Sequence, residues 1–82
     1  MIRVEEVVLC DGWDIRVNDV FSNPSMPYRL KVKKIELEDG ETNLNNAWVH
    51  CIAVHLKNKN KVINTSENLC NRAWYINEFW TK

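Results

Sequence analysis

Apolar and charged residues alternate along much of this chain, which is the spacing of β-strands that bury one face and expose the other. The stretch 28–38 shows this most clearly, because Leu30 and Val32 share one parity and the apolar residues after Lys33–Lys34 follow the other. A change of parity inside a strand is typical of a β-bulge. We therefore predict a long strand with a bulge at Lys33–Lys34.

The same pattern predicts shorter strands before and after this one. The predicted strands cover 1–10, 13–21, 28–38, 48–56 and the pair 62–63. Residues 48–56 are apolar on both faces, which indicates a central strand. Pro24 and Pro27 lack backbone donors and indicate a loop. The parity shift near Val20 favours a second bulge or kink.

The segment 66–80 fits two structures. Ser66 is a suitable helix N-cap. The residues with the spacing of one helical face are Leu69, Ala73, Ile76 and Trp80. The aromatic residues of the same segment also suit a final strand. We predict a short helical turn at 66–70, and the sequence leaves helix and strand open for the rest.

The length of 82 residues predicts one domain, 1–82. A chain of this size buries only about 60 to 65 % of its unfolded surface, so its core needs bulky side chains. Four Trp, two Tyr and two Phe supply them. The same aromatic content would be out of place in a disordered tail.

Net charge is zero, with eleven basic and eleven acidic side chains. This balance argues against a generic, charge-driven attraction to nucleic acid or anionic membrane. The charges are unevenly distributed, however, since seven of the eleven basic residues lie in 29–34 and 57–61. The sequence therefore predicts a dipolar surface that could steer a charged partner.

Cysteine usage and hydropathy point to a cytoplasmic protein. Cys10, Cys51 and Cys70 are odd in number and widely spaced, which fits a reducing cytosol better than a disulfide scaffold. No apolar run approaches the roughly 20 residues that span a bilayer, so we expect no membrane association. The abundance of Asn, with eleven copies, alongside Lys and Ile indicates an origin in a mobile element, a phage or an AT-rich bacterium.

The candidate metal ligands and nucleophiles lack a suitable spacing. They are Cys10, His50, Cys51, His55 and Cys70. On a strand, Cys51 and His55 would lie about 13 Å apart, too far to share one ion, and His50 and Cys51 would face opposite sides. Both glycines lie in Asp-Gly turns, so no phosphate-binding loop is available. We expect no metal site, no cofactor and no enzymatic activity.

Two binding surfaces remain as candidates. The first is a basic patch for DNA or RNA, made of Arg29, Lys31, Lys33, Lys57, Lys59 and Lys61. Lysines can equally keep an edge strand soluble, and the tryptophans that would stack on bases can equally fill the core. The second is a protein interface made of Tyr28, Arg72, Tyr75, Phe79 and Trp80, residue types that dominate interface energetics. The alternative for these residues is closure of the core by the final segment.

Several motifs follow one another in a suggestive order. They are Asn18-Asp19-Val20-Phe21, a Pro-containing loop, Tyr28-Arg29-Leu30-Lys31-Val32, an Asp-Gly turn and Val49-His50-Cys51-Ile52-Ala53-Val54. This order resembles small SH3-like barrels of phage and bacterial origin, with Asn18 where such barrels usually have Gly. The resemblance covers about 15–63, implies a non-enzymatic binding role and assigns no site residues.

These expectations define a mainly β protein, either a small SH3-like barrel or a strongly bent antiparallel sheet of about five strands, with a short helical element near the C-terminus. The expected function is that of a small cytosolic adaptor or inhibitor that binds another protein. The alternative function is binding of nucleic acid through the basic strands.

Overall fold

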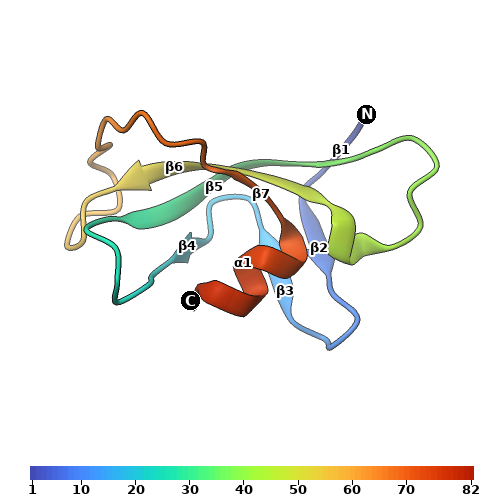
Figure 1. Cartoon of the computed structure of the whole chain (residues 1–82). Coiled ribbons are helices and arrows are strands. Elements are labelled where there is room, and N and C mark those ends of the chain that lie inside the picture. Colours follow the sequence, from blue (N-terminus) through green and yellow to red (C-terminus); the bar gives the residue numbers. More distant parts are fainter.

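The computed structural model describes residues 1–82, and antiparallel strands dominate it (Figure 1). The elements in chain order are β1 (Ile2–Val4), β2 (Glu6–Val8), β3 (Asp14–Arg16), β4 (Val20–Phe21), β5 (Arg29–Leu37), the 3₁₀-helix η1 (Leu44–Asn46), β6 (Trp48–Val54), β7 (Cys70–Arg72) and α1 (Ala73–Phe79). The prediction of a mainly β fold with a helical element near the C-terminus is confirmed.

Strand β5 is the longest element and pairs with three others. It pairs with β6 along its length, with β1 at its end and with β4 at its start. Strand β7 adds to the other edge of β6, which gives the order β1-β5-β6-β7. Strands β2 and β3 pair only with each other. This order is an open path, and no closed barrel is found.

The bulge predicted at Lys33–Lys34 is confirmed. Val32 lies opposite Cys51, and Lys34 lies opposite His50, so Lys33 has no partner on β6. The extra residue restores the parity, and Ile35 therefore enters the same core as Val32. One inserted residue thus keeps a nine-residue strand buried on one face.

The second bulge or kink, predicted near Val20, is not a bulge, because Val20 and Phe21 pair regularly with β5. The chain turns there instead, between β3 and β4, and Asn18 takes a positive φ of 78°. Its N–H donates to the carbonyl oxygen of Val32 at 2.9 Å, and the N–H of Val32 donates to Asp19. The change in the apolar alternation near Val20 therefore marks a turn that is hydrogen-bonded to β5.

The predicted strand over 1–10 is divided at Glu5. Its first part, β1, joins the main sheet, and its second part, β2, forms the hairpin with β3. The carbonyl of Glu5 accepts a hydrogen bond from Val17 at 3.0 Å, which fastens the break to the turn after β3. Val7 and Leu9 are consequently buried, whereas Ile2 and Val8 are exposed.

The helical turn predicted at 66–70 is wrong, because the helix begins later. Cys70–Arg72 pairs with β6 instead, and the backbone N–H groups of Glu67 and Cys70 donate to the side chains of Thr65 and Asn68. Helix α1 starts at Ala73, with Arg72 as its N-cap residue. The helical face predicted for Ala73, Ile76 and Trp80 is buried in the core, while Leu69 lies outside the helix.

Residues 62–63 also differ from the prediction, since Val62 makes only an isolated bridge to Val54. The main core comprises 14 buried residues, all apolar apart from the tyrosine hydroxyl. They come from both sheets and from α1, so the helix covers the inner face of the sheet that Leu30 and Val49 line.

The positive φ at Asn18 gives a test of the turn. Asn tolerates this conformation better than other non-glycine residues, whereas a β-branched residue pays a steric penalty of about 1 to 2 kcal/mol. We expect Asn18→Gly to keep the free energy of unfolding within about 1 kcal/mol of the parent, and Asn18→Val to lower it by about 1 to 2 kcal/mol. Urea denaturation followed by tryptophan fluorescence measures both. Equal stability of the two variants would contradict the turn geometry.

Candidate functional site

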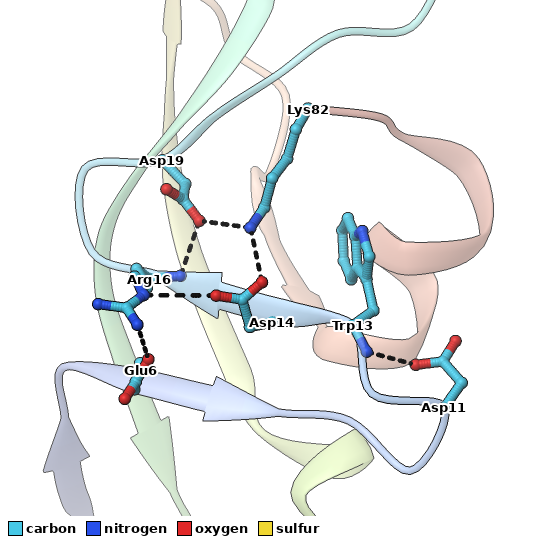
Figure 2. A network of polar contacts seen from close by, with 7 residues as sticks. All are labelled: Glu6, Asp11, Trp13, Asp14, Arg16, Asp19 and Lys82. Atoms are coloured by element: carbon cyan, nitrogen blue, oxygen red, sulfur yellow. Dashed lines mark hydrogen bonds and ion pairs between the residues drawn. The ribbon is translucent and has the colours of Figure 1, made fainter.

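A network of charged side chains ties the residues after α1 to strand β3 (Figure 2). The Lys82 ammonium lies 3.0 Å from Asp14 and 3.3 Å from Asp19, and 5.7 Å from the ring centroid of Trp13. Next to it, Ser22 and Thr81 exchange backbone hydrogen bonds of 2.7 and 2.9 Å. These contacts set the position of Trp80 against the sheet.

Contacts within this network shift the pKa values of Asp14 and Lys82. Hydrogen bonds from Lys82 and Arg16 lower the pKa of Asp14. Burial lowers the pKa of the Lys82 ammonium, but the hydrogen bonds of the ammonium to Asp14 and Asp19 raise this pKa by more. The net effect is a raised pKa of Lys82. The pair of Lys82 and Asp14 is therefore charged at neutral pH and holds the residues after α1 to strand β3.

A pocket of about 220 Å³ opens between α1, the 23–28 loop and residues 67–69. We call it the aromatic pocket. Its lining residues are Asn23, Met26, Tyr28, Leu30, Glu67, Asn68, Leu69, Asn71, Tyr75, Phe79 and Trp80. Four of the five residues predicted for a protein interface are therefore brought together here, namely Tyr28, Tyr75, Phe79 and Trp80.

Tyr28 and Trp80 form the buried part of this pocket. They are 6 % and 7 % exposed, and their rings stack with centroids 6.3 Å apart at an interplanar angle of 22°. The hydroxyl of Tyr28 donates a hydrogen bond to the carboxylate of Glu67. Burial, followed by the bond to Glu67, raises the pKa of Tyr28 to about 12. The phenol is therefore a neutral donor throughout the physiological range.

Tyr75 and Phe79 form the exposed part, and Trp74 continues it along α1. Their exposed fractions are 37 %, 50 % and 44 %. The rings of Tyr75 and Phe79 lie 4.7 Å apart, and those of Trp74 and Tyr75 lie 5.9 Å apart. Three neighbouring aromatic side chains thus leave much of their surface in water on a helix of seven residues.

Arg72, the fifth residue predicted for the interface, lies elsewhere. Its guanidinium stacks on the ring of Trp48 at 3.7 Å, donates to the carbonyl of Asn46 at 2.8 Å and approaches Glu38 at 3.6 Å. Glu38 also accepts a hydrogen bond from the Trp48 indole at 2.8 Å. Arg72 therefore holds β7 to β6 on the outer face of the sheet.

The same outer face aligns three chemically active groups across three strands. Glu36 lies 2.8 Å from the Nε2 atom of His50, and the Cys70 sulfur lies 3.9 Å from the same nitrogen. A general base for the thiol would instead need one nitrogen for the sulfur and the other for the carboxylate. Burial and the nearby Glu36 carboxylate raise the pKa of Cys70, which opposes thiolate formation. The arrangement does not have the geometry of a nucleophilic centre.

The remaining metal-ligand candidates stay apart. No group of three or more His, Cys, Asp or Glu side chains has the geometry to hold a metal ion. Cys10 is exposed, and burial raises the pKa of Cys51 to about 12. Of the five candidates named from the sequence, His50 and Cys70 make a side-chain contact, and Cys70 also adds to the raised pKa of Cys51.

Five of the six predicted nucleic-acid-binding residues lie at one end of the main sheet, and Lys33 lies in the middle of β5. Arg29 and Lys31 stand on β5, Lys33 is the bulged residue, and the lysines of 57–61 occupy the turn after β6. Arg29 joins the two parts, because its guanidinium donates to the carbonyl of His55 at 3.2 and 3.3 Å.

Sequence reasoning missed the polar lining of the pocket, namely Asn23, Glu67, Asn68 and Asn71. Nothing in their local pattern marks them, since they come from three separate segments. Trp74 was considered from the sequence only as a residue that could stack on bases, and the structure places it beside Tyr75 on the exposed side of α1.

No protein-family model, curated protein or solved structure matches this chain. None of the helices has the length and apolar character that a bilayer crossing requires. The function is therefore argued from the geometry of the molecule.

The buried phenol gives a test by pH. Tyrosine has a pKa of about 10 in the unfolded chain and about 12 at position 28 in the folded protein. A raised folded-state pKa means that stability is complete below pH about 10 and declines toward pH about 12. Urea denaturation at alkaline pH should show this decline in the free energy of unfolding. The decline should be smaller in Tyr28→Phe, which lacks the phenolic hydroxyl. The same decline in both proteins would contradict the assignment.

The three thiols give a second test. Exposed Cys10 should react first with iodoacetamide at mildly alkaline pH, and Cys51 last, because burial and a raised pKa both protect it. Pulsed alkylation with mass spectrometry measures the order. In concentrated urea the three rates should converge. Faster modification of Cys70 than of Cys10 would reveal an activated thiol and contradict our interpretation of the Glu36, His50 and Cys70 alignment.

Proposed function

We propose that this protein is a small, non-catalytic binding protein that captures a protein partner through the aromatic pocket and the exposed rings of α1. The observation that carries the proposal is the half-exposed row of Trp74, Tyr75 and Phe79 beside a pocket lined by buried Tyr28 and Trp80. Contiguous exposed apolar surface on a small protein is typical of an interaction site.

The size of the pocket supports a side chain as its occupant. Pockets for small-molecule ligands usually measure about 300 to 1,000 Å³. The aromatic pocket, at about 220 Å³, is smaller and open at one side. It suits one bulky apolar side chain of a partner, and a buried anchor of this kind dominates many protein interfaces.

The polar lining supports a polypeptide. Asn71 presents an amide group that can both donate and accept hydrogen bonds, and the NH₂ group of Asn68 can donate while its Oδ1 atom accepts a bond from the N–H of Cys70. A polypeptide backbone offers matching donors and acceptors beside each side chain. Asn23 has a structural part instead, because its amide donates to the carbonyl of Phe79 at 3.1 Å and fixes the loop to α1.

Charge favours protein over nucleic acid at this surface. Glu67 lines the pocket and Glu78 is exposed on α1, and neither pairs with a basic side chain. Two uncompensated carboxylates repel a phosphate backbone. The cationic residues Arg29 and Lys31 alternate with Leu30 along β5, so they stand on the other face of the sheet.

The finer architecture is part of the same proposal. We propose that the likeness to SH3-like barrels lies in a curved β5, bent at its bulge, with the β2–β3 hairpin and α1 closing the core in place of further barrel strands. The open sheet order and the 14-residue core support this arrangement.

The test removes the exposed rings. We expect Tyr75→Ala and Phe79→Ala each to weaken partner binding by about 1 to 3 kcal/mol, or about 5- to 150-fold in Kd, because anchors of this type carry most interface energy. Affinity capture from an extract of the cells that produce the protein, with quantitative mass spectrometry, identifies a partner by its loss from both variants. Titration of the purified partner then gives the Kd.

A matched control keeps this test specific. Ile2→Ala and Val8→Ala remove similarly exposed apolar side chains from other strands and should leave the partner bound. Trp80→Ala should instead unfold or strongly destabilise the protein, by about 3 to 5 kcal/mol, because the ring is buried. Retention of every captured protein by the Tyr75 and Phe79 variants would overturn the proposal.

A further inference from the structure

A second surface has a separate chemistry, and it extends from the end of the sheet opposite the β1 pairing to the bulge at Lys33 in the middle of β5. We call it the basic end, and it comprises Arg29, Lys31, Lys33, Lys57, Lys59 and Lys61. Because β5 and β6 are antiparallel, the start of β5 lies beside the end of β6, and Arg29 pairs with Val54. The turn that carries the lysines follows directly, so the two sequence segments meet at one end of the molecule (Figure 1).

Hydrogen bonds join the two parts into one surface. The guanidinium of Arg29 donates twice to the carbonyl of His55, and the N–H of His55 donates to the carbonyl of Lys61 at 2.9 Å. The imidazole of His55 also accepts a bond from the N–H of Lys57 at 3.2 Å. The lysine turn is therefore held against β5.

The basic end is positive because none of its Lys and Arg side chains forms an ion pair with an acidic residue. Four of the eleven Lys and Arg side chains form ion pairs with acids, namely Arg16, Lys34, Arg72 and Lys82. Seven make none, and six of these seven are the residues of the basic end; the seventh is Arg3. A neutral protein thus concentrates its uncompensated positive charge in one place, which the net charge alone conceals.

From this surface we infer a second binding activity: the basic end binds the phosphate backbone of a nucleic acid duplex, without reading its sequence. Arg29 and Lys31 are two residues apart on a strand, so their side chains repeat at about 6.6 Å along β5. The lysine turn adds three more cations beside them. Cations arranged in this way neutralise successive phosphates and release their counterions.

The composition of the turn favours a duplex over two other anionic surfaces. Its tip reads Lys57-Asn58-Lys59-Asn60-Lys61, and the exposed apolar residues Leu56 and Val62 flank it at the base. A turn that inserts into a membrane carries its apolar residues at the tip. The basic end also contains no Trp, Tyr or Phe side chain, whereas single-stranded binding relies on stacking against such rings.

The experiment is a salt titration with a fluorescein-labelled DNA duplex of roughly 20 base pairs, followed by anisotropy from about 25 to 200 mM NaCl. We expect saturable binding that weakens steeply with salt. The triple variant Lys57→Gln, Lys59→Gln, Lys61→Gln should bind about tenfold or more weakly at low salt and reduce the salt slope by about 2 to 3, since each lost phosphate contact contributes about 0.9.

Single substitutions provide the matched comparison. Lys59→Gln should weaken binding, whereas Arg3→Gln removes one equally unpaired cation from β1 and should leave binding unchanged. Circular dichroism and urea denaturation confirm that each variant is folded. None of these substitutions touches the aromatic pocket, so the failure of this inference and the failure of the proposed function are separate outcomes.

Three results would overturn the inference. One is the absence of saturable duplex binding at the lowest salt. Another is an equal loss of binding in Arg3→Gln and Lys59→Gln, which would show a general charge effect. The third is competition by poly-L-glutamate as effective as that by unlabelled duplex at equal charge, which would assign the basic end to an acidic protein.

Discussion

The fold depends on the pairing of β5 with β6. Strand β5 is the only strand that pairs with three others. Strand β7 pairs with β6 alone, and α1 follows β7 directly. A small chain has few residues with which to build a core, so every position of the central ladder must deliver its side chain to the correct face. The bulge at Lys33 makes this possible, because it returns Ile35 to the buried face after two successive lysines.

Both proposed surfaces follow from this ladder. On the inner face, Leu30 lines the aromatic pocket, and β7 delivers α1 so that Trp80 stacks on Tyr28. On the outer face and at the end of the ladder, Arg29 and Lys31 meet the lysine turn that follows β6. The alternation of a single strand thus separates an apolar, carboxylate-bearing surface from a cationic one. A protein that uses both would hold a protein partner and a nucleic acid on opposite faces of one sheet.

The sequence could predict the features that depend on the spacing of apolar residues within one segment, and few others. The strands at 28–38 and 48–56, the bulge and the buried face of Ala73, Ile76 and Trp80 all follow from spacing along one segment. The pocket could be predicted only in part, because its aromatic residues are conspicuous in type while Glu67 and Asn71 reach it through long-range pairing. The start of α1 was misplaced, since pairing of Cys70–Arg72 with β6 overrides the N-cap preference of Ser66. The alignment of Glu36, His50 and Cys70 depends on cross-strand register, which no single segment encodes.

The most direct test of the central claim is site-specific photo-crosslinking in cells that produce the protein. The photoreactive residue p-benzoyl-phenylalanine replaces Phe79 in one protein and Val8, an exposed residue of the other sheet, in a second. Our account predicts that position 79 crosslinks to one defined protein and that position 8 does not. Crosslinking of the same proteins from both positions, or of none from position 79, would contradict an interface at the aromatic pocket.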